Sequence, residues 1–265
     1  MGKKSLITVK FLDRIRHDDA AWGEDYSARA KNIQALMRNE YELLLNEHYR
    51  KPKQFRDIIV RNFLYKGPIV EWYTRIKLRL ERNYQVYDEL IPRKAKITDI
   101  GCGYGYLSLI LGMVSSERHI HGIDYDEEKI EIAEHCMSKP RNVSFSHGDI
   151  TECELEPCDV FILSDVLHYF SDEKQLRVIE KCIHNLNPGG RILIRDGNSD
   201  LHDKHKLTRF TEFFSTNIGF NKTDDMQLHF LSATRLQAIV SSFDMKMSII
   251  NKGVMTSNML FLIEK

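Results

Sequence analysis

Apolar residues recur with two periods from about residue 95 onward. Short apolar runs alternate with longer segments in which apolar positions return every three to four residues. The short runs predict seven strands, at residues 97–100, 119–123, 143–145, 159–163, 191–195, 245–250 and 259–263. Because helical segments separate most of these strands, the pattern predicts right-handed crossovers and a mainly parallel sheet.

Polar residues mark the expected ends of the helices between the strands. Residues 107–114 form an apolar helix, and Asp126 is placed to cap the next one. Ile130, Ala133 and Met137 give that second helix its expected buried stripe. Two further helices are expected to begin after serine caps. Their caps and apolar positions are Ser171 with Leu176, Ile179, Ile183 and Leu186, and Ser232 with Leu236, Ile239 and Val240.

Residues 1–94 follow another pattern, rich in helix formers and polar residues. Residues 71–90 are a candidate amphipathic helix that leads into the first strand. We therefore expect residues 1–94 to be a helical N-terminal extension or cap, and residues 95–265 to be the main domain. A lid insertion is expected within that domain at about residues 201–231.

Composition narrows the class of protein. The chain has 38 basic and 38 acidic residues, so a broad nucleic-acid-binding surface is not expected, although a local basic patch stays open. Its five cysteines form no C-x-x-C pair, so we expect no zinc or other metal site and a reducing, cytoplasmic setting. No apolar run reaches the roughly 20 residues that span a bilayer, and attachment at the membrane periphery remains open.

A glycine cluster and an acidic residue define the candidate ligand site. Gly101, Gly103 and Gly105 follow the first strand and precede a helix, where glycine lets the backbone turn sharply and approach a ligand. Asp124 ends the second strand, which should lie beside that loop. A carboxylate there can accept hydrogen bonds from the ribose of an adenosine, whereas the alternative is a turn or capping aspartate.

The glycine spacing separates two cofactor classes. A nicotinamide-binding loop reads G-x-G-x-x-G, and Tyr106 stands where its last glycine would be. The observed spacing is D-x-G-x-G-x-G from Asp99. It resembles the first motif of class I S-adenosylmethionine (SAM)-dependent methyltransferases. Later motifs of that family are similar to residues 122–126, 147–150, 159–170 and 186–192.

This resemblance implies a fold, a cofactor and site residues. It implies a Rossmann-like, doubly wound α/β fold with a mainly parallel seven-stranded sheet, SAM as cofactor and S-adenosylhomocysteine as product. The backbone around the three glycines would hold the methionine part, and Asp124 would take the ribose with Tyr125 packing nearby. Asp99 is a further implied cofactor contact. The other implied cofactor contacts are Asp149 and Ile150 at the adenine, Ser164 or Asp165 at the methionine end or the acceptor, and Tyr73 and Arg75 on the covering helix.

Methyl transfer from a sulfonium needs mainly positioning and exclusion of water, and an oxygen acceptor often also needs a base. His168 follows the fourth strand and Asp196 the fifth, so both are candidate catalytic residues. His168 also has a structural alternative. Phe214 and Phe220 of the lid insertion either line an apolar acceptor pocket or pack the lid onto the body.

The N-terminus carries a second, shorter resemblance. Residues 5–15 look like the closing strand of a glycerolipid-type acyltransferase domain, and residues 26–41 like the helix after it. The chain would then be the methyltransferase end of an acyltransferase–methyltransferase fusion. The H-x4-D motif of such enzymes occurs only at His119 and Asp124, within the second strand, so no acyltransferase activity is expected.

The sequence therefore predicts a SAM-dependent methyltransferase that acts on a small-molecule, acyl or lipid-related acceptor. A non-catalytic SAM-binding scaffold and, less favoured because of Tyr106, a nicotinamide-dependent oxidoreductase remain open.

Overall fold

Strand β4 (Cys158–Ser164) shows why this sequence folds in layers. Its residues Val160, Phe161, Ile162 and Leu163 are all 0% exposed, so apolar material must cover both of its faces. The computed structural model describes residues 9–12, 14–16, 22–45, 50–80, 83–197, 229–252 and 258–265. Two compact units divide the chain, Met1–Tyr49 and Arg50–Lys265.

The second unit holds the sheet and most of the helices. Its strands are β1 (Ala95–Ile100), β2 (Arg118–Asp124), β3 (Val143–His147), β4, β5 (Leu186–Gly197), β6 (Lys246–Lys252) and β7 (Asn258–Glu264). Its helices are α2 (Pro52–Asn62), η3 (Leu64–Lys66), α3 (Pro68–Leu80), α4 (Tyr84–Leu90), α5 (Tyr106–Val114), α6 (Glu127–Glu134), η4 (Leu167–Tyr169), α7 (Asp172–His184) and α9 (Ala233–Ser242).

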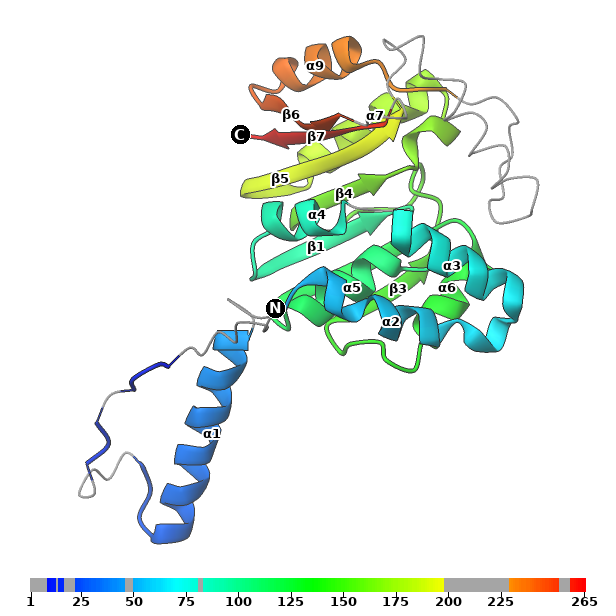
Figure 1. The fold of residues 1–265 in the computed structure, drawn as a ribbon. Helices are drawn as coiled ribbons and strands as arrows, with labels where there is room; N and C mark the ends of the chain where they lie inside the picture. Colours follow the sequence, from blue (N-terminus) through cyan, green and yellow to red (C-terminus); the bar gives the residue numbers. More distant parts are fainter. Residues whose placement is uncertain are drawn as a thin grey trace, which may run out of the picture. The chain divides into compact units, whose positions relative to one another are not determined.

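The sheet has seven strands in the order β3-β2-β1-β4-β5-β7-β6 (Figure 1). The pairs from β3 to β5 are parallel, whereas β7 runs antiparallel to both β5 and β6. This confirms the expected doubly wound, mainly parallel seven-stranded sheet. The last two strands, β6 and β7, form an antiparallel pair.

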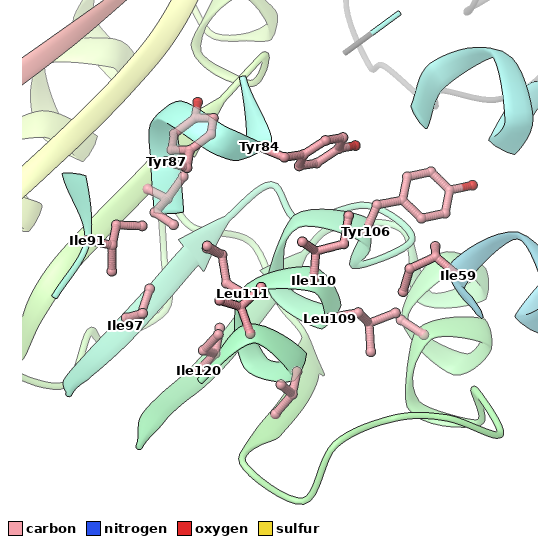
Figure 2. Close-up of a cluster of buried hydrophobic side chains, with 14 of the residues drawn as sticks. Ile59, Tyr84, Tyr87, Ile91, Ile97, Tyr106, Leu109, Ile110, Leu111 and Ile120 are labelled. Atoms are coloured by element: carbon pink, nitrogen blue, oxygen red, sulfur yellow. The ribbon is translucent and has the colours of Figure 1, made fainter. Parts of the chain in front are cut away.

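Two hydrophobic clusters cover the two faces of the sheet. Alternate residues along one strand fall in different clusters: Ile162 belongs to the first cluster, and Phe161 and Leu163 to the second. The first cluster also contains residues of α2, α4, α5 and α6, and the second those of α7 and α9. Figure 2 shows part of the first, in which Ile59 and Tyr84 approach the side chains of α5. The helices before β1 thus complete a core that the sheet alone would leave open.

The structure revises several expected helix boundaries. The expected helix over residues 71–90 is two helices, α3 and α4, and Asn83 is the N-cap residue of the second. Met137 was expected in a buried stripe, but α6 ends at Glu134 and Met137 is 97% exposed. Leu186 was expected on α7, but it opens β5, because α7 ends at His184.

Capping predictions had mixed outcomes. The Asp126 carboxylate accepts from Lys129 N, and the Ser232 hydroxyl accepts from Arg235 N, so both caps are confirmed. Ser171 is the N-cap residue of α7, but its side chain makes no capping hydrogen bond.

The first unit consists mainly of helix α1 (Tyr26–Leu44). Asp25 caps it by accepting from Ala28 N at 2.8 Å. The strand expected over residues 5–15 lies partly outside the described residues, and residues 9–12 and 14–16 form no strand. Among the described residues, no helix combines the length and apolar character needed to cross a bilayer.

A buried cation fastens the segment before β1 to the start of β2. Arg118 Nη1 donates to Asp88 Oδ1 at 2.8 Å, and both side chains are buried. Its other nitrogens donate to the carbonyls of Asp88, Ile91 and Pro92. This network compensates the guanidinium for the water that it loses.

We expect Arg118→Ala to lower the free energy of unfolding by about 3 kcal/mol or more, because the Asp88 carboxylate stays buried after losing its partner. Arg93, which also contacts Asp88 at 3.1 Å, limits the loss. Urea denaturation measures it. The control is Arg177→Ala at an exposed pair with Glu173, where about 0.5 kcal/mol or less is expected. Equal losses in the two variants would contradict the assignment.

Candidate cofactor and active site

The order of the strands places the candidate site at one edge of the sheet. From β1 the chain turns first to β2 and β3 on one side, and later to β4 and β5 on the other. In doubly wound sheets, ligands bind beyond the carboxyl ends of the strands where this direction reverses. Here that edge lies beyond β1 and β4, and the loops after them carry the glycine cluster and His168.

The glycine loop after β1 has a backbone that side chains would disturb. Gly101, Gly103 and Gly105 have φ angles of 70°, 55° and 71°. A Cβ atom on Gly101 would lie 2.4 Å from Val166 Cγ2, and one on Gly105 would lie 2.4 Å from Phe145 Cζ. A Cβ on Gly103 would meet no atom within 4 Å. The outer two glycines therefore allow close packing, whereas Gly103 borders open space that a ligand can fill.

Asp124 joins the end of β2 to this loop. Its Oδ2 accepts from Gly103 N at 2.7 Å, and its Oδ1 accepts from Asp126 N at 2.9 Å. The expected proximity of Asp124 and the glycine loop is therefore present. Each carboxylate oxygen can accept further hydrogen bonds, so hydroxyl groups could still bind to it.

The residues that follow β2 and β3 extend the same edge. Tyr125 is 53% exposed, and the centroid of its ring lies 6.2 Å from that of His147. Asp149 Oδ1 accepts from the backbone N and the hydroxyl of Thr151, both at 2.8 Å, which fixes the turn after the strand. Ile150 is buried in the second cluster. The edge thus presents the open backbone at Gly103, then the Asp124 carboxylate and then the exposed Tyr125 ring. This order fits a ligand in which an amino-acid chain is joined to an adenosine.

Asp99, the first residue of the glycine motif, lies inside the fold. The Ser108 hydroxyl donates to its Oδ2 at 2.5 Å, which links β1 to α5. Burial raises the pKa of Asp99 to about 7, and the Ser108 hydrogen bond opposes that rise. The negative charge of Asp124 raises it further. The charge of Asp99 therefore interacts with that of Asp124, the residue expected to bind the ribose.

Helix α3 borders the glycine loop through a residue that the sequence did not single out. Thr74 is buried, and its hydroxyl shares a 2.7 Å hydrogen bond with that of Tyr106, the first residue of α5. Tyr73 beside it is partly buried against the first cluster. Arg75 instead pairs with Glu71 at 2.7 Å on an exposed side of the helix. Helical periodicity could have identified Thr74, because it lies one turn after the partly buried Val70.

Lys129 and Tyr104 are two further neighbours of the site that the motifs did not reveal. Lys129 Nζ lies 5.8 Å from the centroid of the Tyr104 ring. Burial lowers the pKa of Lys129, and the nearby negative charge of Asp124 partly opposes that decrease. Burial also raises the pKa of Tyr104 to about 12. A lysine inside α6 gives no sequence signal for such a role, whereas Tyr104 could have been flagged as the variable residue between two glycines.

The two candidate catalytic residues form one buried pair. His168 Nδ1 contacts Asp196 Oδ1 at 2.6 Å, and His168 N donates to Asp196 Oδ2 at 3.2 Å. Gly197 N also donates to Asp196 Oδ1, at 2.7 Å. Because a carboxylate can only accept, Nδ1 carries the hydrogen and the second ring nitrogen, Nε2, is left as the basic one. Asp196 is therefore arranged to orient His168 rather than to act as a separate base.

Ser164 and Asp165 lie at the end of β4, as expected. Asp165 has a φ angle of 57°, which is rare for a residue with a side chain. Its carboxylate pairs with Arg195 of β5, and its N donates to Arg195 O at 2.8 Å. The ion pair holds this unusual turn in place, next to the loop that carries His168.

Most of the expected lid insertion, with Phe214 and Phe220, lies outside the described residues. The described residues just before α9 contact the His168–Asp196 pair. His229 N donates to His168 O at 2.9 Å, and the ring centroids of Phe230 and His168 lie 6.2 Å apart. The segment that follows the insertion therefore packs directly on His168.

The strand order, the glycine loop and Asp124 together define the class I methyltransferase fold that the sequence resembles. A family model described as "Methyltransferase domain" matches residues 91–250. The chain belongs to this family. The match spans every strand from β1 to β5, together with both candidate catalytic residues.

Known proteins agree with this assignment. A carboxy-S-adenosyl-L-methionine synthase of Campylobacter concisus is 25% identical over 128 residues, which are 48% of this chain and 54% of that protein. O-methyltransferase 12 of Dictyostelium discoideum is 32% identical over 114 residues, 40% of this chain and 29% of that protein. The chain thus spans about half, or less, of the length of these relatives.

Solved structures share the fold. Human N-acetylserotonin methyltransferase, in complex with SAM, matches with a TM-score of 0.55 and 18% identity over 84% of this chain and 68% of that one. An O-methyltransferase family 2 protein of Planctomyces limnophilus, in complex with apigenin, matches with a TM-score of 0.52 and 21% identity, over 69% of this chain and 57% of that one. The recognition of a class I methyltransferase from sequence is confirmed.

The raised pKa of Asp99 makes stability depend on pH. Between roughly pH 4 and 7 the folded chain retains a proton on Asp99 that the unfolded chain has released, so the free energy of unfolding falls as pH rises. We expect Asp99→Asn to flatten this slope in urea titrations. Ser108→Ala should extend this pH range upward, because it removes the hydrogen bond that lowers the pKa of Asp99 in the folded chain. Asp57→Asn, at an exposed position on α2, is the control, and a slope unchanged by Asp99→Asn would refute the assignment.

Proposed function

We propose that this chain transfers the methyl group of SAM to a small-molecule acceptor and releases S-adenosylhomocysteine. The observation that carries the proposal is the hydrogen bond from Gly103 N to Asp124 Oδ2, beside a glycine with open space in front of it. This pairing supplies backbone donors and a carboxylate at the adjoining ends of two parallel strands. Bound SAM supplies an activated methyl group on a sulfonium.

In this proposal each part of the edge binds one part of the donor. The glycine loop holds the methionine end through its backbone, and Asp124 accepts from the ribose hydroxyls. Tyr125 packs near the ribose after β2, and Asp149 and Ile150 bind the adenine after β3. Tyr73 and Arg75 remain candidates for closing the site from α3, and Ser164 and Asp165 for its acceptor end.

His168 acts in this proposal as the base for a hydroxyl acceptor. The geometry that supports it is the Asp196 carboxylate at His168 Nδ1, which fixes one tautomer and leaves Nε2 as the proton acceptor. Asp196 also stabilises the positive charge that the ring gains when it takes the proton. Burial of both side chains keeps bulk water away from the pair.

The relatives give a reason to favour a hydroxyl acceptor. Several of the similar proteins are named O-methyltransferases, and one of these was solved with apigenin. Phe230 beside His168 offers an aromatic surface for an apolar acceptor. The acyl or lipid-related acceptor and the link to an acyltransferase remain narrower hypotheses that rest on the N-terminal resemblance alone.

Chemistry on the donor itself is a second candidate, because several relatives are named carboxy-S-adenosyl-L-methionine synthases. Such chemistry has to recognise an added carboxylate. Arg195 of β5 lies beside the end of β4, but it already pairs with Asp165. The oriented His168–Asp196 pair therefore favours methyl transfer. Mass spectrometry of the nucleoside product separates S-adenosylhomocysteine from carboxylated SAM.

Gly103→Ala tests donor binding. Its methyl group would occupy the open space, so we expect at least roughly tenfold weaker binding of SAM and S-adenosylhomocysteine by calorimetry, with about 1 kcal/mol lost in stability from the left-handed backbone. Gly189→Ala is the matched control, since Gly189 has φ of 76°, has equally open surroundings and precedes the buried part of β5. Wild-type affinity in Gly103→Ala, or no affinity in the wild type, would exclude this site.

His168→Gln and Asp196→Asn test the acceptor side. In a panel of hydroxylated aromatic acceptors, we expect His168→Gln to lower kcat for S-adenosylhomocysteine formation by roughly 10²–10⁴-fold. Asp196→Asn should cause a smaller loss, because an amide no longer enforces the reactive tautomer. The affinity for SAM should stay within about twofold in both. His184→Gln, an exposed histidine at the end of α7, is the control, and an unchanged kcat in His168→Gln would remove His168 as the base.

A further inference from the structure

The helical segment before the sheet carries a concentration of positive charge, of which the proposed reaction uses at most Arg75. Residues 50–80 contain nine basic and two acidic residues, a net charge of +7, in a chain with an overall net charge of zero. The segment comprises α2, η3 and α3. Its basic residues are Arg50, Lys51, Lys53, Arg56, Arg61, Lys66, Arg75, Lys77 and Arg79.

Helix α2 separates these charges from its apolar residues. Ile59 and Val60 are buried in the first cluster, which α5 shares. Lys53, Asp57 and Arg61 follow one another at four-residue intervals and are exposed. The exposed residues of α2 therefore include two basic side chains and one acidic side chain.

Helix α3 continues this division. Thr74 and Leu78 are buried on its inner side. Trp72, Arg75 and Arg79, which are spaced by three and four residues, are exposed. An indole and two guanidinium groups therefore share the outer side of this helix.

Large apolar side chains stand among the exposed charges. Tyr65 is 63% exposed and Trp72 61%, and Ile58 and Leu64 are exposed as well. Lys66 Nζ lies 5.7 Å from the centroid of the Tyr65 ring. We call these four apolar residues, with Lys53, Arg61, Lys66 and Arg79, the basic–aromatic face. Exposed aromatic and aliphatic residues beside basic ones are typical of a surface that meets a partner.

We propose that the basic–aromatic face docks the protein on an anionic phospholipid bilayer. Its basic residues complement the negative surface potential of such a bilayer. Tyrosine and tryptophan favour the boundary between headgroups and acyl chains, and the aliphatic Ile58 and Leu64 gain from burial there. A nucleic acid would use the same charges and could stack on Tyr65 and Trp72, but it would leave the exposed aliphatic side chains of Ile58 and Leu64 without a partner.

The same helix connects this face to the cofactor edge. The inner side of α3 bonds to Tyr106 through Thr74, immediately after the glycine loop. A bilayer against the outer side of α3 would be separated from the glycine loop by this one helix. An acceptor in the headgroup region would then lie close to the proposed cofactor site. Docking itself does not depend on the proposed methyl transfer.

Vesicle flotation of the full chain tests the electrostatic part. We expect binding to vesicles of phosphatidylcholine with phosphatidylglycerol, loss of binding as salt increases, and little binding to phosphatidylcholine alone. Each basic residue near an anionic bilayer contributes roughly fivefold, so Lys53→Gln, Arg61→Gln and Lys66→Gln together should weaken binding roughly a hundredfold. The matched control neutralises three exposed lysines elsewhere, Lys94, Lys174 and Lys246, and should change binding far less.

Tryptophan fluorescence tests the apolar part. The chain has two tryptophans, Trp22 and Trp72, so Trp22→Phe leaves Trp72 as the reporter. We expect its emission to shift to shorter wavelength with the anionic vesicles and its quenching by acrylamide to fall. Without vesicles Trp72 should be readily quenched.

Four outcomes would overturn the proposal. They are no binding to anionic vesicles, equal loss in the patch and control variants, shielding of Trp72 before vesicles are added, and preferential binding of a random-sequence oligonucleotide. Shielding that depends on protein concentration would instead mean that a second copy of the chain covers this face. A folded, vesicle-binding chain whose Trp72 does not shift would contradict the insertion of the aromatic residues.

Discussion

The two backbone hydrogen bonds that Asp124 accepts are the constraint on which the candidate site depends. The bond from Gly103 N connects the end of β2 to the loop after β1, and the bond from Asp126 N holds the carboxylate against the start of the next loop. The loop can reach Asp124 only because glycine accepts the left-handed conformations at its turns. Parallel pairing of β1 and β2 brings the two strand ends to the same edge. Sequence spacing, backbone conformation and sheet topology therefore act together at this point.

The sheet was predictable because its strands are short apolar runs with clear boundaries. Burial on both faces demands such runs, as in β4, and the seven expected strands all occur. Helix ends were less predictable. Met137 and Leu186 continue an apolar period, but hydrogen bonds at the ends of α6 and α7 stop each helix before them. Periodicity describes which side of a helix is buried, whereas local end interactions decide its length.

Parts of the site could be read from motifs, and others could not. The glycines and Asp124 follow from their positions at strand ends, and His168 and Asp196 were each singled out for the same reason. That the last two form one pair required the structure, because 28 residues separate them. The contacts Ser108–Asp99 and Thr74–Tyr106 likewise join different elements. A residue type that is common in helices, such as serine or threonine, does not indicate from the sequence alone that it bonds to a distant element.

The buried Arg118 constrains how this family member can diverge. Four oxygens from residues 88–92 receive its hydrogens, so a lysine, with one nitrogen, could not replace the planar guanidinium at all of them. A single substitution there leaves a buried carboxylate behind. Simultaneous replacement of Arg118 and Asp88 by apolar residues of similar volume would avoid that penalty. Folding stability therefore ties residues 88 and 118 to each other, although neither side chain takes part in the proposed chemistry.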